Sequence, residues 1–355
     1  MTSDGRRPVA VFISNLRTLD DMTGLYPPDW HERVLAARQS PGYISSPPFD
    51  IAGVATGYLV LMLRSGEEVM RDMAGAAALV MEMTRYAVET LDGDVIGLGS
   101  LTTSITHGGQ DVADLIDRQG WKIRATHGDS GSVAAIIECL DNAGVRPEAK
   151  IGLVGAYGVI GTALSRHYAK TSSQLVCCGP RPEKLLELVR RLRQESGADA
   201  LPAVDIRMMT LADAVITVTS HPSALLGPQH VRPGALVFDP AVPANTKDEP
   251  GWHDPERDNL VIANASQVRL PGVAVHSAMF GTFDEPDSCP TSYACLAETL
   301  ANAVFGDREH HIGEIDLDFV ARTARRFALL GFRHAVPRMS GMDISRALLR
   351  HALSR

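Results

Sequence analysis

The sequence predicts an α/β fold, in which parallel strands alternate with helices. Hydrophobic residues make up 45% of the chain but aromatic residues only 5%, which favours α/β layers over a β-sandwich. A chain of 355 residues exceeds one small core, so two or three packed units are expected. Short apolar runs bounded by turn residues also recur at the spacing of strand–helix–strand units: 150–154, 174–178, 213–218, 235–238 and 259–262.

The elements are expected in a definite order along the chain. The N-terminal part should contain, in turn, a strand at 9–14, a Pro-rich irregular region through 27–48, one long helix at 67–90, a strand at 95–98, a small-residue loop at 99–109, a helix at 110–118 and a strand at 122–125. Further helices are expected at 129–142, 160–170, 183–194, 292–305 and 316–330.

Composition excludes several classes of protein. The net charge of −8 argues against a nucleic-acid-binding protein. The cysteines are odd in number and lack the spacing of a zinc site, so we expect no disulfide framework, no metal and a cytoplasmic protein. No stretch is long and apolar enough to cross a bilayer. The five cysteines are Cys139, Cys177, Cys178, Cys289 and Cys295.

The strongest motif follows the strand at 150–154 and has the spacing Gly-x-x-Gly-x-x-Gly before a helix. Such glycines allow a tight turn, the approach of a diphosphate to bare backbone, and close packing of helix on strand. The motif predicts a Rossmann-type dinucleotide-binding domain over 129–270, with an N-terminal α/β substrate domain over 1–128 and C-terminal helices over 271–355. A glycine-rich turn without a ligand is the alternative. The expected cofactor contacts are Gly155, Ala156, Tyr157, Gly158, Val159, Ile160 and Gly161.

The end of the next strand bears on the choice between NAD and NADP. An acidic residue there would bind the ribose hydroxyls and repel a 2′-phosphate. The chain instead continues from Cys178 with Gly179, Pro180 and Arg181, and an Arg can pair with a phosphate. We therefore expect NADPH as cofactor; the alternative is that Arg181 is a solvated residue at a helix start.

Cys295 is the candidate nucleophile. Thr291 or Ser292 would cap the helix at 292–305, so that Cys295 falls in its first turn, where the helix dipole favours a thiolate. From the residues alone, a packing role within an Ala- and Leu-rich helix is the competing interpretation. Cys289 is a rival in a loop without an evident activator.

Several segments, in the same order, resemble the long-chain acyl-[acyl-carrier-protein] reductases of cyanobacteria, which reduce a fatty acyl thioester to a fatty aldehyde with NADPH. The resemblance covers nearly the whole chain. It is carried by 9–16, Val95 to Ser104, Thr126-His127-Gly128-Asp129-Ser130, Val154 to Gly161, Phe238 to Pro243, Tyr293 to Thr299 and Gly331-Phe332.

The resemblance implies that Cys295 accepts the acyl group as a thioester and that the donor is acyl carrier protein or coenzyme A. Hydride from NADPH would then release the aldehyde. The chain departs from the family at three positions: Pro180 stands where the family has Arg, Asp129 where it has Asn, and Gly131 where His is common.

Other polar residues are weaker candidates. Ser104, with its neighbours in the 99–109 loop, could donate a hydrogen bond to an oxyanion or merely cap the loop. His127 could protonate the leaving thiol or be structural, and His276 could lie near the nicotinamide. Thr219 and Pro240 complete the expected cofactor contacts.

The expected function is therefore NADPH-dependent reduction of an acyl thioester to an aldehyde through an acyl-cysteine. Two alternatives remain. One is an NADP-dependent alcohol or ketone oxidoreductase that resembles shikimate dehydrogenase and forms no covalent intermediate. The other is a non-catalytic NADP(H)-binding protein.

Overall fold

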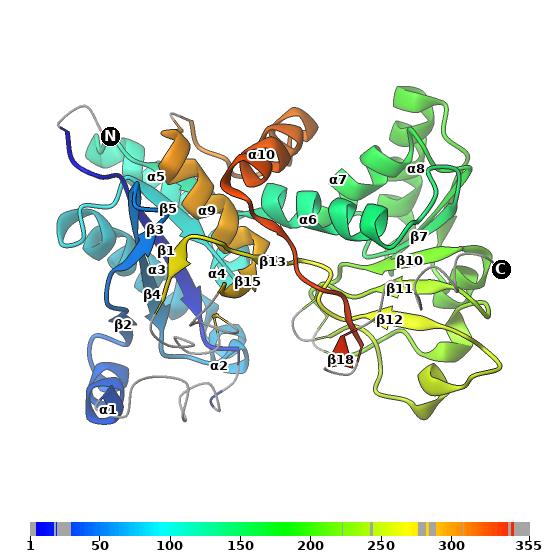
Figure 1. The fold of residues 1–355 in the computed structure, drawn as a ribbon, viewed down its shortest axis with the longest axis horizontal. Helices are drawn as coiled ribbons and strands as arrows, with labels where there is room; N and C mark the ends of the chain where they lie inside the picture. The colour runs from blue at the N-terminus through cyan, green and yellow to red at the C-terminus, as the bar shows by residue number, and fades with distance from the viewer. Residues whose placement is uncertain are drawn as a thin grey trace. The chain divides into compact units, whose positions relative to one another are not determined.

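The structure is a computed structural model that describes residues 5–17, 19, 30–221, 223–241, 244–275, 282–283, 289–307, 309–339 and 342–343. The chain divides into two compact units (Figure 1). Unit 1 comprises Met1–Ser132 and Val268–Arg333, and unit 2 comprises Val133–Gln267 and His334–Arg355. Each unit is described by itself.

Unit 1 is built on a seven-stranded mixed sheet with the order β14-β3-β4-β1-β5-β6, and β2 also pairs with β4. Neighbours from β4 through β6 run parallel, whereas β2 and β3 run antiparallel to β4. The strands are β1 (Val9–Asn15), β2 (Tyr43–Ser45), β3 (Phe49–Ile51), β4 (Ala55–Met62), β5 (Val95–Leu98), β6 (Arg124–Thr126) and β14 (Val273–Ala274).

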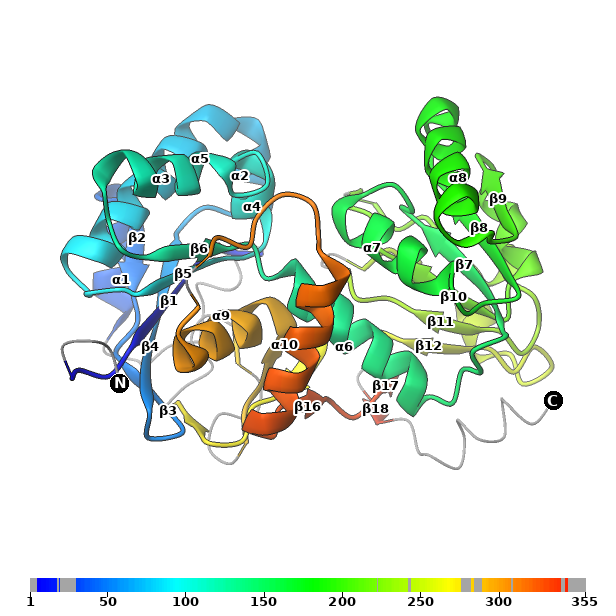
Figure 2. The same cartoon turned by 90° about the horizontal axis from the view of Figure 1, so that it is seen from above.

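Helices cover both faces of this sheet (Figure 2). Alternate residues of β5 show why: Ile96 and Leu98 belong to the buried core on the α3 face, while Gly97 faces α9 so closely that a Cβ there would overlap Thr299. The helices of unit 1 are α1 (His31–Gln39), α2 (Gly66–Arg71), α3 (Met73–Glu89), α4 (Leu101–Ile105), α5 (Gln110–Gln119), α9 (Ala294–Phe305) and α10 (Leu317–Leu330).

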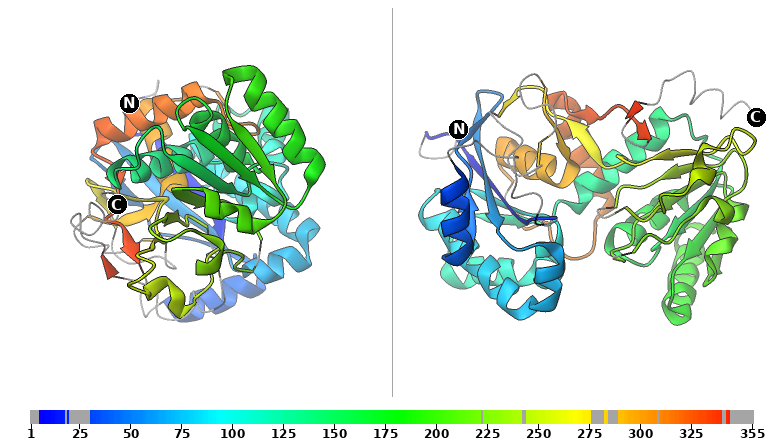
Figure 3. Two further views of the ribbon diagram at one scale, coloured as in Figure 1. Left: turned by 90° about the vertical axis from the view of Figure 1, so that its right-hand side faces the viewer. Right: turned by 90° about the horizontal axis from the view of Figure 1, so that it is seen from below.

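Unit 2 contains a six-stranded sheet, coloured green to yellow in Figure 3, with the order β12-β11-β10-β7-β8-β9. Every neighbouring pair is parallel. Counted from β7, this is the 3-2-1-4-5-6 order of the Rossmann fold. The strands are β7 (Lys150–Val154), β8 (Gln174–Cys178), β9 (Ala200–Ala203), β10 (Ala214–Thr217), β11 (Leu236–Phe238) and β12 (Leu260–Ile262).

The principal helices of unit 2 are α7 (Val159–Tyr168) and α8 (Pro182–Ser196); α6 (Asp129–Asn142) begins in unit 1. Short 3-10 helices lie at Ile206–Leu211, Pro228–His230 and Pro250–His253. The structure also contains two small sheets. One consists of β15 (Thr291–Tyr293), β13 (Gln267–Arg269) and β16 (Arg333–His334), and the other of β17 (Arg338–Met339) and β18 (Met342–Asp343). The predicted α/β class and Rossmann-type domain are confirmed.

Several local expectations are corrected. The helix expected at 67–90 is interrupted at Asp72, whose side chain accepts a hydrogen bond from Gly75 N and caps α3. The region expected to be irregular contains α1 and part of the sheet. Thr291 and Ser292 do not cap α9, because they lie in β15 and Tyr293 is the N-cap.

The chain divides differently from the three regions expected. Residues 268–333 belong to unit 1 rather than to a separate C-terminal region, because α9 packs on the first sheet through Thr299 at Gly97. Within the described part of the chain, no helix has the length and hydropathy needed to span a membrane.

Candidate active site

In unit 2, the turn between β7 and α7 has the geometry expected of a diphosphate-binding loop. Gly155 has a φ of +89°, and a Cβ there would lie 2.8 Å from Val218 O. A Cβ at Gly161 would overlap Gly155 O, so α7 can approach the strand only because residue 161 lacks a side chain. Bare backbone therefore lines this turn.

The start of α7 offers free donors at the same place. Gly158 is the N-cap, and Thr162 N donates to Gly158 O at 2.7 Å. The backbone amides of residues 159–161, in the first turn of the helix, have no acceptor within the helix. They lie at the positive end of the helix dipole. Since β7 lies between β8 and β10, the turn also sits at the topological switch point, where open α/β sheets bind ligands.

Two basic residues, Arg181 and Lys184, follow the carboxyl end of β8 and flank Glu183 in the first turn of α8. The ring of Tyr157 packs so tightly on Gly179 that a Cβ there would lie 2.5 Å from the ring. Lys184 Nζ lies 5.7 Å from the centroid of the same ring. Arg181 is exposed and is the N-cap residue of α8. Arg181 and Lys184 thus follow the second strand of the Rossmann order, where residues near the adenosine ribose lie in Rossmann folds.

A buried polar network follows β10 and β11. Asp239 is fully buried and accepts hydrogen bonds from Thr217 Oγ1 at 2.8 Å and from Thr246 N at 2.7 Å. Thr219 N donates to Asn245 Oδ1 at 3.0 Å, and Thr219 Cγ2 would lie 3.1 Å from a Cβ at Gly155. Thr219 is therefore placed beside the glycine turn, as its predicted role requires.

Pro240 immediately follows Asp239, and its carbonyl oxygen accepts a hydrogen bond from Ser266 Oγ at 3.2 Å. Its predicted contact with the cofactor remains a prediction.

In unit 1, Cys295 is the second residue of α9 and is half-buried. The turn after β6 packs directly on it. Gly128 has a φ of +73°, and a Cβ at Gly128 would overlap Cβ of Cys295. A Cβ at Gly131 would lie 2.5 Å from Ala294 O. Bare backbone at 128 and 131 therefore holds the first turn of α6 against the first turn of α9.

Glu298 ties these two helix starts together. It lies one turn beyond Cys295, is fully buried, and accepts hydrogen bonds from Thr126 Oγ1 and from Gly131 N, the latter at 2.6 Å. Burial raises the pKa of its carboxyl group, while the nearby His127 opposes the increase. Each carboxyl oxygen of Glu298 thus accepts a hydrogen bond from the segment 126–131 beside Cys295.

His127 is buried with both ring nitrogens engaged. Nδ1 accepts from Asp129 N at 3.0 Å, and Nε2 lies 3.2 Å from Gly313 O. This pattern assigns the neutral imidazole with its proton on Nε2, and burial lowers the pKa of His127. In this arrangement the one proton of His127 is held by a backbone carbonyl, and its predicted role as proton donor to a leaving group stays a prediction.

Asp129 has a different environment. Its side chain is 19% exposed, and its Oδ2 lies 3.7 Å from His127 Nδ1. Burial raises the pKa of its carboxyl group to about 7. Asp129 therefore changes charge near neutral pH.

The thiol of Cys295 is held in its protonated form. Burial, followed by the charge of Asp129, raises the pKa of the thiol to about 12, and Glu298 adds to the increase. The sequence predicts the opposite, a thiolate favoured by the helix start. Desolvation and two nearby carboxyl groups outweigh the helix dipole here.

The other predicted site residues stay predictions. Ser104 is exposed on α4. Cys289 is half-buried, and His276 lies outside the described residues. The remaining cysteines are buried, as a packing role predicts: Cys139, Cys177 and Cys178.

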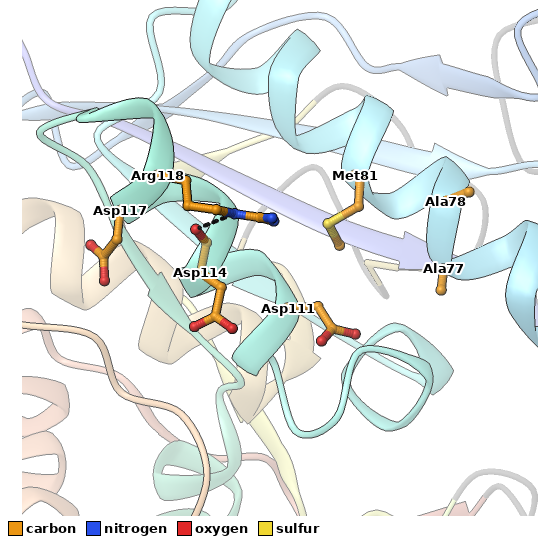
Figure 4. A pocket seen from close by; sticks show the side chains of 7 residues that line it. All are labelled: Ala77, Ala78, Met81, Asp111, Asp114, Asp117 and Arg118. Carbon is orange, nitrogen blue, oxygen red and sulfur yellow. Dashed lines mark hydrogen bonds between the residues drawn. The ribbon is translucent and has the colours of Figure 1, made fainter.

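A separate hollow of about 580 Å³ lies between α3 and α5 (Figure 4). Asp111, Asp114 and Asp117 line it together with one basic residue, Arg118, so acidic side chains outnumber basic ones there. It is therefore distinct in chemistry from the glycine turn. Among the described residues, no cluster of His, Cys, Asp or Glu has the arrangement of a metal site.

Sequence reasoning missed the roles of Glu298 and Thr126 and noted Asp129 only as a departure from the family. One signal was available: Glu298 is the single charged residue of α9, and a buried acid needs partners. Those partners, on another segment, could not be read from the helix itself.

No protein-family model and no curated protein sequence matches the chain. Among solved structures, quinate dehydrogenase from Corynebacterium glutamicum, in complex with NAD, aligns over 91% of this chain and 99% of its own at 12% identity, with a TM-score of 0.43. A quinone oxidoreductase from Thermus thermophilus, described with its NADPH complex, aligns over 37% of this chain and 42% of its own at 19% identity, with a TM-score of 0.28.

A probable ornithine cyclodeaminase from Bordetella pertussis Tohama I aligns over 57% of this chain and 68% of its own, at 20% identity and a TM-score of 0.27. These are distant similarities, and the Rossmann assignment of unit 2 stands on its own strand order.

Proposed function

We propose that this protein is an oxidoreductase that uses a nicotinamide dinucleotide. The observation that carries the proposal is the bare-backbone turn at Gly155, Gly158 and Gly161, at the switch point of a sheet in Rossmann order. Hydride transfer is the chemistry that such a cofactor supplies when bound. The chain supplies the backbone donors for its diphosphate.

Gly158→Ala tests the turn without disturbing the fold. Gly158 has a φ of −67°, and a Cβ there would lie 3.3 Å from Gly155 O, so alanine fits with a small adjustment but places a methyl group beside the diphosphate site. We expect NADPH affinity, measured by calorimetry, to fall at least about tenfold. Gly66→Ala, where a Cβ would lie 3.5 Å from Leu101, is the matched control. Equal affinity in both variants would contradict the proposal.

We further propose a preference for NADPH, supported by Arg181 and Lys184 at the end of β8. An Arg–phosphate pair contributes on the order of 1.5–3 kcal/mol. Arg181→Ala should therefore weaken NADPH binding about tenfold or more and leave NADH binding nearly unchanged. A parallel loss for both nucleotides would instead assign Arg181 a role in folding.

One substrate chemistry is hydride transfer between the cofactor and an alcohol or ketone, without a covalent intermediate. The raised pKa of the Cys295 thiol supports it, because a protonated thiol is a poor nucleophile.

The second candidate is reduction of an acyl thioester, from acyl carrier protein or coenzyme A, to an aldehyde through an acyl-cysteine. It is supported by the half-buried position of Cys295 at the start of α9, beside bare backbone at Gly128. Unlike the first chemistry, it requires a nucleophilic sulfur.

Intact-mass spectrometry separates the two candidates. The protein is incubated with octanoyl- and palmitoyl-coenzyme A, and with the corresponding acyl carrier protein thioesters, in the absence of NADPH. An acyl adduct that Cys295→Ser abolishes supports the acyl-thioester reaction. No adduct, together with NADPH oxidation by a ketone panel that is unchanged in Cys295→Ser, supports the non-covalent reaction.

A further inference from the structure

Asp129 follows Gly128 in the turn that packs on the first turn of α9, beside Cys295. The preceding residue, Gly128, contacts Cys295 so closely that a Cβ would overlap it. Asp129 is also the charged group that contributes most to the electrostatic perturbation of the thiol. The backbone contact at Gly128 and this charge interaction together indicate a thiol–carboxyl pair.

Of the three titratable residues His127, Asp129 and Glu298, Asp129 is the one whose acceptor atoms are not used in hydrogen bonds with other described residues. Glu298 uses one oxygen for Thr126 Oγ1 and the other for Gly131 N. His127 uses Nδ1 for the amide of Asp129 and Nε2 for Gly313 O. Among the described residues, no hydrogen-bond donor holds the Asp129 carboxylate, and His127 Nδ1, at 3.7 Å, carries no proton to give it.

We propose that Asp129 accepts the thiol proton of Cys295 as the sulfur attacks an activated acyl group. The bond between sulfur and acyl carbon forms, the S–H proton passes to the carboxylate, and the bond from the acyl carbon to the leaving group breaks. Asp129 then returns its proton to the departing thiol or alcohol. The inference deepens the second candidate of the proposed function, on which it rests.

The test uses p-nitrophenyl acetate as the acyl donor and no dinucleotide. Nitrophenolate release and an acetyl adduct seen by intact mass report acylation, with Cys295→Ser as the blank. General-base assistance is typically a factor of 10²–10⁴, so Asp129→Asn should slow acylation by roughly a hundredfold. Asp129→Glu should restore part of the rate, because it retains a carboxylate.

Alkylation by iodoacetamide provides the opposing measurement, because its rate follows the thiolate fraction. Asp129→Asn removes a negative charge beside the sulfur and should raise the alkylation rate of Cys295 severalfold above pH 7. A role limited to structure would move both rates in the same direction. Asp114→Asn, which removes an exposed carboxylate from α5 of the same unit, is the control and should change neither rate.

Three outcomes would overturn the inference: unchanged acylation in Asp129→Asn, acylation and alkylation that fall together, or wild-type Cys295 that acquires no acetyl group. None of them touches the dinucleotide proposal, since no dinucleotide is present. Conversely, acetylation that depends on Asp129, in a protein that accepts no acyl thioester, would support the pair and reject the thioester substrate.

Discussion

Replacement of Asp129 by Asn should stabilise the protein, and the gain should depend on pH. Burial raises the pKa of Asp129 from 3.8 to about 7. A carboxyl group with a raised folded-state pKa binds its proton more tightly in the folded protein than in the unfolded chain. The free energy of unfolding is therefore highest below about pH 4, and the contribution of Asp129 to it is lost as the pH rises to about 7.

The magnitude follows from the size of the shift. About three pKa units, at 1.36 kcal/mol each, give an upper limit of ~4 kcal/mol. The side chain is 19% exposed, and solvent screening reduces the expected gain to about 2–4 kcal/mol.

Urea unfolding of the wild type and Asp129→Asn between pH 4 and 9 measures this gain. The difference in unfolding free energy should be small at pH 4, grow to pH 7 and remain constant above it. Asp114→Asn, exposed on α5, should stay within about 0.5 kcal/mol of the wild type throughout. A difference for Asp129→Asn that is constant with pH, or that grows toward acid, would refute the assignment of a desolvated carboxyl group.

Two further substitutions, one in each unit, test how the glycine turn and the buried Glu298 are packed. Gly161→Ala should abolish NADPH binding and destabilise unit 2 by about 1–3 kcal/mol, because its Cβ would overlap Gly155 O. Calorimetry measures the binding and thermal unfolding measures the stability. Wild-type affinity for NADPH in this variant would contradict the turn geometry. Glu298→Ala should lower the free energy of unfolding by about 3–5 kcal/mol, because Thr126 Oγ1 and the Gly131 amide lose their buried acceptor. Glu298→Gln should keep most of the stability. Equal losses in both variants would contradict the role of these two hydrogen bonds.

The Rossmann-type sheet of unit 2 and its glycine turn could be predicted because their signals are local. The strand at 150–154, the glycine spacing and the following helix are contiguous, and each glycine serves a requirement of that same turn. The structure confirms the strand and the helix within a residue or two.

The first sheet was harder to predict. β4 lies at its centre, paired with β1 on one side and with β2 and β3 on the other. Its last four residues, Leu59 to Met62, are all buried, so no alternation of apolar and polar residues marks the strand. The break at Asp72 was also missed, because the apolar spacing of a helix continues on both sides of it.

By itself, the sequence determined the α/β class, the bare-backbone turn and the place of Cys295 in the first turn of a helix, because these depend on neighbours along the chain. The tertiary structure alone decided the protonation of that cysteine. Asp129 and Glu298 approach the sulfur through the contact of α6 with α9, and desolvation with two nearby carboxyl groups raises the thiol pKa to about 12. Charge and burial act through space, so only folding brings such groups together.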